Sequence, residues 1–379
     1  MTNKQSEYPL LPYSQLVFDM LKTDPDVYYT MFSVRVNKRE VDMLRLKCAI
    51  ETALRNHPVL SMRVDAAGMQ HYEPLSDINY GQYHAVNFCD EGESVRIEVA
   101  YNRILGDTQS ELIVFEDVFR AYLGLPLMPD HYIAYLERIE QYKRTPRYEE
   151  NRRVLEQEFD AMTCPVRPKT DVPLNVDMEP IEGTLVEEYK TLYSKLSVFS
   201  HEQVLPLTAI ILLASALAIM EYNNTNEAAL TWAYEGRESE DEQRIVGSLH
   251  RDVPFRIQQS NIEDRESAIR EVRKRYRDGI THSSYPFTLT KPHTDIWNYA
   301  LNVLVRPTAN DMEEKIPFPF EMVPPANEPN PAYALLDVEI HEQADSLQLL
   351  YRYSATHYKP ESIRRFADLV RKYVEWLID

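Results

Sequence analysis

The sequence predicts an α/β (α+β) fold made of two lobes. In both halves of the 379-residue chain, runs of β-branched and aromatic residues alternate with longer segments in which apolar residues recur every three or four positions. A proline-rich stretch separates the halves, and a hydrophobic content of 44% is ample for a packed core. Two lobes of similar mixed composition favour a functional site between them.

The first lobe is expected to cover residues 1–163. Ser110 is the predicted N-cap of its second helix, and Gly124 just past the end of that helix favours a left-handed C-terminus. The pair His57-Pro58 ends the first helix, because proline disfavours helical geometry in the residue before it. The predicted elements are a strand over 27–36, a helix over 39–56, a strand over 95–101, a helix over 110–122 and helical segments over 130–160.

Repeated prolines predict a linker over residues 164–184, because proline does not fit inside helices or central strands. The second lobe is then expected over 185–379. Its last helix starts at Pro360, a first-turn position that tolerates proline, and the proline-rich segment 311–331 is predicted to be a loop. The other predicted elements are a helix over 204–220, a strand over 228–233, a helix over 264–278, a strand over 297–305, a hairpin over 333–353 and the final helix over 360–377.

The composition excludes several classes of function. With 41 Lys and Arg against 60 Asp and Glu, the net charge is −19, so nucleic acid is a poor partner. Only nine glycines occur, and no GxGxxG or GxxxxGK[ST] motif is present, which excludes the common nucleotide-binding loops. Cys48, Cys89 and Cys164 are far apart, so neither a disulfide scaffold nor a metal site is expected.

One apolar run resembles a membrane span in composition. Val204 to Met220 is 17 residues long, at the bottom of the spanning range, and it lacks basic flanks and an aromatic belt. We therefore predict a buried helix and no membrane span. The polar first residues contain no signal-peptide core, so a cytoplasmic location is expected.

Short motifs follow one another along nearly the whole chain. They are Pro9-Leu-Leu-Pro12-Tyr-Ser-Gln15, Arg55-Asn-His57-Pro58-Val-Leu60, Trp232 to Arg237 with Val246 to Arg256, His282-Ser-Ser-Tyr285-Pro286-Phe287, and the strand Leu347 to Ser354. In this order and spacing they resemble the PLxPxQ, RHPxLR, GR, VGxFxNTLPLR and HxxYPF segments and the last strand of nonribosomal peptide synthetase condensation domains. Each motif alone is weak, but their order is specific to that family.

The resemblance implies two chloramphenicol-acetyltransferase-like lobes that form a V-shaped pseudo-dimer with a tunnel between them. Members of the family join two acyl groups, each carried by the phosphopantetheine arm of a carrier protein, and the acceptor amine attacks the donor thioester to give an amide. This chemistry needs the amine beside the thioester and a histidine near the amine proton. No bound cofactor is expected, because a phosphopantetheine arm or a CoA thioester carries the substrate.

The chain departs from the family at its HHxxxDG motif, whose second histidine is the catalytic one. Aligned on Asp107, the sequence has Asn102 and Arg103 in place of both histidines and Thr108 in place of the glycine. Arginine stays protonated at working pH, so Arg103 cannot act as a general base. A register one residue earlier places Tyr101 and Asn102 on the histidines and loses the aspartate, and neither register supplies an imidazole.

Asp107 resembles the family's structural aspartate, which forms an ion pair with an arginine to hold the loop. Arg237 and Arg256 are the two alternatives for that partner. His250 is the imidazole that would replace the missing base if it faces the tunnel. The other histidines in family motifs are expected to be structural and hydrogen-bonded, namely His57 and His282.

These substitutions predict a condensation-domain-like protein that acts on or docks to carrier-tethered acyl or peptidyl thioesters and is impaired in standard amide-bond condensation. One alternative is an acyltransferase that makes an ester or amide from acyl-CoA or another thioester, because positioning alone carries part of the rate and Arg103 can stabilise an oxyanion or steer a carboxylate. The other is a non-catalytic recruitment domain, like the family's X-type domains, which have arginine at the second histidine and recruit a tailoring enzyme. The expected partners are thus a carrier protein or a tailoring enzyme.

The basic run 270–277 is either a solvated helix surface or a docking site for an acidic carrier protein.

Overall fold

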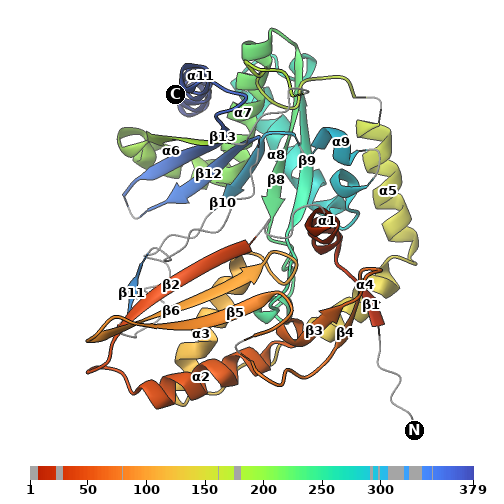
Figure 1. Cartoon of the computed structure of the whole chain (residues 1–379). Helices are drawn as coiled ribbons and strands as arrows, with labels where there is room; N and C mark the ends of the chain where they lie inside the picture. The colour runs from red at the N-terminus through yellow and green to blue at the C-terminus, as the bar shows by residue number, and fades with distance from the viewer. Residues whose placement is uncertain are drawn as a thin grey trace. The chain divides into compact units, whose positions relative to one another are not determined.

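The computed structural model describes residues 7–22, 29–78, 80–160, 162–174, 181–290, 293–297, 299–305, 320–323, 335–343 and 345–379. Contacts divide the chain into two compact units (Figure 1). The first unit contains Met1–Arg144, Glu235–His250 and Ala309–Ala332, and the second contains Thr145–Tyr234, Arg251–Thr308 and Tyr333–Asp379. The units therefore interleave along the chain, whereas each predicted lobe is one continuous stretch.

The first unit combines two antiparallel sheets with α-helices. Its elements are β1 (Glu7–Pro9), α1 (Pro12–Leu21), β2 (Tyr29–Asn37), α2 (Met43–Asn56), the 3-10 helix η1 (Pro58–Ser61), β3 (Met62–Val64), β4 (Met69–Tyr72), β5 (His84–Asp90), β6 (Ser94–Asn102), α3 (Thr108–Leu123), α4 (Tyr132–Tyr142), the 3-10 helix η2 (Glu242–Arg244) and β11 (Glu321–Met322). The larger sheet has the order β11-β2-β6-β5, and the smaller one has the order β1-β4-β3. In Figure 1, α2 and α3 lie along one face of the larger sheet.

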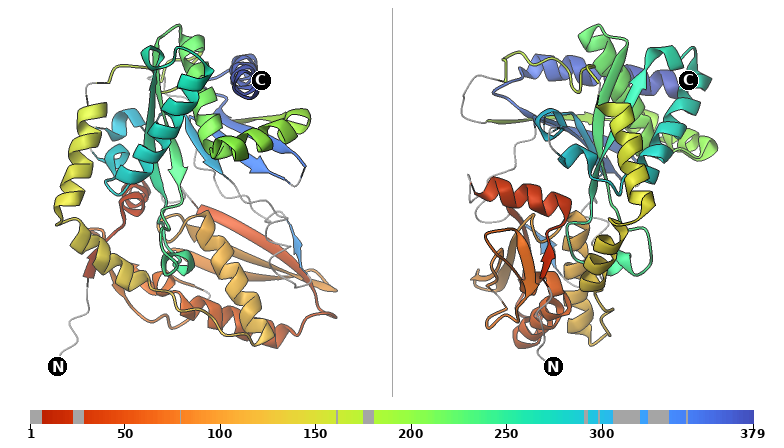
Figure 2. Two further views of the ribbon diagram at one scale, coloured as in Figure 1. Left: turned by 180° about the vertical axis from the view of Figure 1, so that it is seen from behind. Right: turned by 90° about the vertical axis from the view of Figure 1, so that its right-hand side faces the viewer.

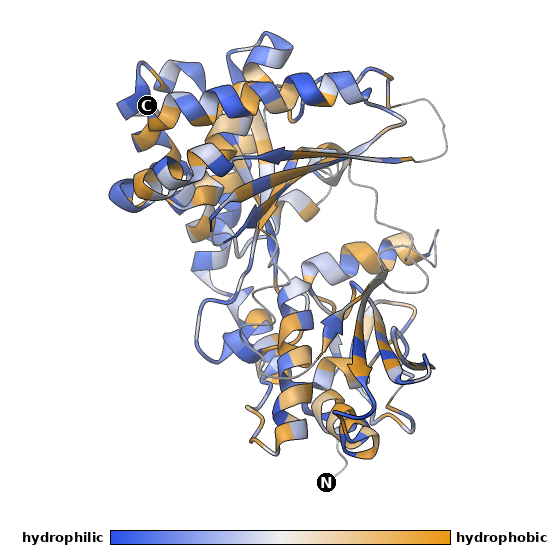
Figure 3. Ribbon diagram, turned by 90° about the vertical axis from the view of Figure 1, so that its left-hand side faces the viewer, coloured by the Kyte–Doolittle hydropathy of each residue, from blue (hydrophilic) through white to orange (hydrophobic). Residues whose placement is uncertain are grey.

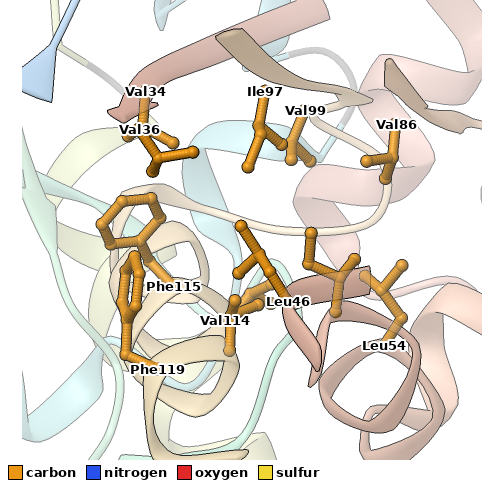
Figure 4. A pocket seen from close by; sticks show the side chains of 12 residues that line it. Val34, Val36, Leu46, Leu54, Val86, Ile97, Val99, Val114, Phe115 and Phe119 are labelled. Atoms are coloured by element: carbon orange, nitrogen blue, oxygen red, sulfur yellow. The ribbon is translucent and has the colours of Figure 1, made fainter. Parts of the chain in front are cut away.

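The core of the first unit lies between that sheet and these two helices. Alternate residues of β6, such as Val95 and Ile97, point toward the helices, as the period of a strand requires. The side chains of the two layers do not quite fill the space between them, and a cavity of about 30 Å³ remains (Figure 4). Its lining is entirely apolar: Val34, Val36, Leu46, Ile50, Leu54, Val86, Ile97, Val99, Val114, Phe115, Val118 and Phe119.

We expect Val114→Ile to stabilise the protein by up to about 0.8 kcal/mol, the value of one buried methylene group. Val114 lines this cavity and also a neighbouring one of about 20 Å³, so an added methyl group has unfilled space to enter. Urea unfolding should show a higher midpoint for Val114→Ile and a lower one for the matched truncation Val114→Ala. A lower midpoint for Val114→Ile would mean that the added group is overpacked and the space is not usable.

The second unit is built on one mixed sheet with the order β7-β13-β12-β10-β8-β9. In it, β10 runs parallel to both β12 and β8, and the other neighbouring pairs are antiparallel. The elements of the unit are α5 (Pro146–Phe159), β7 (Glu182–Glu188), α6 (Lys190–Gln203), α7 (Leu207–Asn223), β8 (Glu227–Tyr234), β9 (Arg251–Gln258), the 3-10 helix η3 (Gln259–Asn261), α8 (Arg265–His282), the 3-10 helix η4 (Phe287–Leu289), α9 (Thr294–Trp297), β10 (Asn302–Val305), β12 (Leu336–Glu342), β13 (Leu347–Ser354) and α11 (Pro360–Ile378).

Helix α7 is the centre of the second unit's core. Every residue from Thr208 to Met220 is buried, and the helix packs with α6, α8 and α11 against apolar residues of the sheet (Figures 1 and 2). The predicted buried helix is thus confirmed. No single described helix is long and apolar enough to cross a membrane, and only as a pair bent by 106° do α6 and α7 together reach that length and apolarity. In contrast, α11 is amphipathic, and hydrophilic and hydrophobic residues alternate along its ribbon in Figure 3.

Most predicted elements are present, with four corrections. Asp107, not Ser110, caps α3. The helix predicted from Val204 begins only at Leu207, because Val204 is the left-handed C-cap of α6. The strand predicted over 297–305 is confined to β10, and Trp297 ends the short helix α9. The segment 311–331 contains the two-residue strand β11, and most of its remaining residues lie outside the described part of the chain.

Candidate functional site

The site that corresponds to the family motif is the loop between β6 and α3, inside the first unit. Asn102 is the last residue of β6 and is fully buried. Its backbone N–H donates to the carbonyl of Tyr83 (2.8 Å), and its side-chain Oδ1 accepts from the N–H of Ile104 (3.0 Å). Its carbonyl accepts from the N–H of Leu105 (2.9 Å). The asparagine amide therefore shapes the turn at the first histidine position.

Asp107 caps the helix that follows the loop. Its Oδ1 accepts from both the N–H (3.0 Å) and the hydroxyl (2.8 Å) of Ser110, and the Ser110 Oγ lies 3.3 Å from the Asp107 N–H. This is a capping box, with serine in the third helical position. Asp107 and Ser110 are both good cap formers, and Ser110 was the predicted cap. The structure places the cap at Asp107, three residues earlier, where the chain is still extended.

The arginine partner of Asp107 is Arg237, one of the two predicted alternatives. Its Nη1 donates to Oδ2 and its Nη2 to Oδ1, both over 2.9 Å, which is the two-pronged geometry that arginine favours with carboxylates. The side chain of Arg237 is fully buried. The other alternative, Arg256, instead pairs with Glu227. Burial raises the pKa of Asp107, but Arg237, His250 and Ser110 together lower it more, and the net shift is downward. Asp107 is therefore a carboxylate at neutral pH.

Thr108 begins α3 and so has ordinary helical backbone geometry. Threonine therefore causes no backbone strain at the position that the sequence aligns with the motif glycine. The tight approach occurs two residues earlier, at Gly106. A β-carbon on Gly106 would lie 2.9 Å from the β-carbon of Ser110, closer than real carbon contacts allow.

Arg103, which the sequence aligns with the second histidine, is half-buried. Burial lowers its pKa, but nearby groups raise it to a value above that of ordinary arginine: Tyr101, Glu111, Tyr13 and Asp107. The guanidinium is therefore charged at every working pH. It can attract an anion or donate hydrogen bonds to an oxyanion, but it has no basic atom to accept a proton.

The imidazole of His250 belongs to the same unit as this loop. Its ring contacts that of Tyr13 edge-on, with 4.1 Å between ring centroids, and its backbone N–H donates to Oδ2 of Asp107 over 3.2 Å. Helix α1, which carries Tyr13, therefore lies beside the histidine that the sequence indicated.

A second polar cluster, which the sequence did not reveal, fixes the segment Glu235–His250 within the first unit. Arg244 donates to Glu116 over 2.8 Å and also contacts Asp117. The Val246 N–H donates to Oδ2 of Asp130 over 3.0 Å. Together with the hydrogen bond from the Leu249 N–H to Oδ2 of Asp107, these contacts hold the segment against α3 and against Asp130. One sequence signal for this cluster did exist. Asp117 occupies a position in α3 where the apolar spacing of the helix predicts a core residue.

His57 is buried between two carboxylates of this cluster. Its Nδ1 lies 2.9 Å from Oδ2 of Asp130, and its Nε2 lies 3.3 Å from Oδ2 of Asp117. Burial lowers the pKa of His57, but the two carboxylates raise it more, so that it lies above the ordinary value. The prediction of a hydrogen-bonded structural histidine is confirmed. The same holds for His282, whose Nδ1 is 2.9 Å from Oδ1 of Asn151 in the second unit.

Solved structures of nonribosomal peptide synthetase domains share the fold. The X-domain from teicoplanin biosynthesis has a TM-score of 0.78 at 14% identity, covering 100% of this chain and 96% of that chain. The epimerization domain from the third module of tyrocidine synthetase B scores 0.77 at 17% identity, covering 99% and 96%. The starter condensation domain of rhizomide synthetase in complex with C8-CoA scores 0.73 at 12% identity, covering 99% and 95%. The predicted chloramphenicol-acetyltransferase-like fold is thereby confirmed.

A sequence model of the family described as Condensation domain matches residues 93–379. The chain therefore belongs to the condensation domain family, as the motifs predicted. No curated protein sequence matches it significantly.

Proposed function

We propose that this protein is a condensation-domain-like member of nonribosomal peptide assembly that acts on or docks to carrier-tethered thioesters, and that it is impaired in standard amide-bond condensation. The observation that carries the proposal is the pair Asn102 and Arg103. The asparagine is buried and engaged in the turn, and the arginine is held protonated. Neither accepts the proton that an attacking amine must lose.

The rest of the loop is held in place by buried contacts. Asp107 and Arg237 hold the start of α3 and the segment Glu235–His250 together, so the loss of the base is not accompanied by loss of the loop. Positioning alone lowers the barrier of a reaction between a thioester and a free amine. Arg103 supplies a positive charge where an oxyanion or a carboxylate would be stabilised. Slow acyl transfer is therefore compatible with the proposal.

A second candidate function is an acyltransferase that uses acyl-CoA or another thioester and an alcohol or amine. It is favoured by the position of His250, an imidazole that belongs to the unit of the loop and contacts the Tyr13 ring. The rhizomide synthetase domain of the same fold is described with C8-CoA. In this case His250→Gln should abolish transfer from octanoyl-CoA to an amine, while Arg103→Lys should retain part of it.

The proposed function predicts slow condensation by the wild-type protein. With an aminoacyl thioester and an acyl thioester on phosphopantetheine-loaded carrier domains, amide formation followed by mass spectrometry should be at least about 100-fold slower than by a domain with both motif histidines, because a general base contributes roughly 10²–10⁴-fold. The variant Arg103→His should raise the rate, whereas Arg103→Lys, which restores no base, should not.

Carrier binding provides the control for this experiment. If the protein only docks, Arg103→Ala should leave carrier affinity unchanged and no variant should condense. A wild-type rate within about tenfold of the intact domain, equivalent to about 1.4 kcal/mol of barrier, would contradict the proposed impairment.

A further inference from the structure

Helix α8 presents a continuous basic stripe to solvent. Arg270, Arg273, Lys274 and Arg277 are all exposed, and their spacing of three, four and seven residues places them on one face of the helix. On a chain with a net charge of −19, this face is a local reversal of sign. Local charge determines docking more than net charge does.

The charges of this stripe are only weakly paired. Arg270 lies 3.7 Å from Glu266, and Arg277 lies 3.8 Å from Asp278, both beyond hydrogen-bond length and both with more than half of the arginine side chain exposed. Among the described residues, Lys274 forms no ion pair.

Two basic residues of α11 differ, because they are well paired. Lys372 is 2.6 Å from Glu221, and Arg371 is 2.9 Å from Glu187. The fold therefore can neutralise a basic helix surface with its own carboxylates, and on α8 it does so only in part. The weakly paired charges on α8 are therefore available to a partner.

An unusual valine adjoins the stripe. Val204 ends α6 with φ of 49°, a left-handed conformation that is strained for a β-branched residue, and it is 83% exposed. Helix α7 ends in the same way with φ of 55°, but there the residue is Asn224, which tolerates this conformation. The fold thus keeps a strained and exposed apolar side chain where asparagine or glycine would be easier.

The valine and the basic stripe form one surface. The Nη2 of Arg273 donates to the carbonyl of Gln203 over 2.6 Å, which places the middle of the stripe directly beside Val204. At the N-terminal end of α8, Arg265 lies over the ring of Phe199 in α6, with 5.4 Å between the guanidinium carbon and the ring centroid. Both contacts lie within the second unit, so this surface is fixed within one compact body.

We propose that this surface, formed by Arg270, Arg273, Lys274 and Arg277 of α8 with Val204 of α6, docks the acidic face of a carrier protein domain. This inference rests on the proposed function. An apolar contact surrounded by charges is the usual composition of a protein interface. A nucleic acid is disfavoured as the occupant, because the chain as a whole repels phosphates and Glu266, Glu271 and Asp278 lie on the same helix.

The test is the affinity of the full chain for a purified, phosphopantetheine-loaded carrier domain, measured by fluorescence anisotropy at low and high salt. The double variant Arg270→Glu/Lys274→Glu should weaken binding by about tenfold or more and reduce its salt dependence, because it reverses the charge that attracts the partner. The single variants Lys274→Glu on α8 and Lys372→Glu on α11 make the same charge change as each other, half that of the double variant; Lys274→Glu should weaken binding, whereas the control Lys372→Glu should bind like the wild type.

The variant Val204→Gly distinguishes a docking role of Val204 from a merely structural one. Glycine adopts a positive φ without strain, so this variant should unfold at the same temperature as the wild type or higher, and yet it should bind the carrier several-fold more weakly. If the wild type binds the carrier and both the α8 and Val204 variants bind equally well, the surface is wrong although the proposed function stands. If the wild type binds no carrier domain, carrier docking fails and this inference fails with it.

Discussion

Replacing Arg237 with alanine is expected to destabilise the first unit by about 3–5 kcal/mol, the usual cost of leaving a buried charge without its partner. The Asp107 carboxylate would lose two charge-assisted hydrogen bonds of 2.9 Å while remaining buried. Arg237 also donates to the carbonyl of Ile245 over 2.9 Å, so the chain segment that carries it would lose a second attachment. Urea unfolding of the full chain should show the loss as a lower midpoint.

Arg256→Ala is the matched control, because Arg256 pairs with Glu227 with about a fifth of each side chain exposed. Its loss should cost less than half as much. Arg237→Lys keeps the charge but not the two-pronged geometry, and it should recover only part of the stability. Equal costs for Arg237→Ala and Arg256→Ala would show that the Asp107 pair has no special structural role.

Replacing His57 with alanine is expected to cost about as much, because it leaves two buried carboxylates together without a positive charge between them. Asp117 and Asp130 both face the ring, and the cation Arg244 of this cluster is already paired with Glu116 and Asp117. In the wild type, the raised pKa of His57 means that folding favours the protonated imidazole.

The direction of the pH dependence follows from that shift. The contribution of His57 to stability is full below its ordinary pKa of 6.5 and is lost as the pH rises through the higher pKa of the folded state. Urea unfolding at a series of pH values from 6 upward should therefore show a decline that His57→Asn lacks. His282→Asn is the control, since the pKa of His282 is lowered by burial. A wild-type profile parallel to that of His57→Asn would mean that folding does not raise the pKa of the imidazole.

The sequence predicted the elements whose signals are local. The apolar run of α7 and the proline at the start of α11 depend only on neighbouring residues, and both helices are present. The cap of α3 was misplaced by three residues because Asp107 and Ser110 are both cap formers, and only the backbone decides between them. Trp297 was assigned to a strand because aromatic residues favour strands, although its segment forms a short helix.

The chemistry of the site could be predicted from the sequence at positions where the residue type alone determines what the side chain can do. Arginine has no basic atom in any fold, so the absence of a base at residue 103 follows from the residue type alone. The choice between Arg237 and Arg256 could not be made, because it depends on which segment folds back onto α3. The cluster around His57 was missed for the same reason, since its members are distant in sequence and no spacing rule connects them.

The segment Glu235–His250 has a consequence for how the protein is made. It leaves β8 and returns to β9 in the second unit's sheet, but its contacts and its buried residues Ile245, Val246 and Leu249 belong to the first unit. During synthesis on a ribosome, the first 144 residues therefore emerge without part of their own core. The core of that unit gains Ile245, Val246 and Leu249 only after residue 250 has left the exit tunnel, and its larger sheet gains β11 later still. The folding of the first unit must therefore be completed while the second unit is being made.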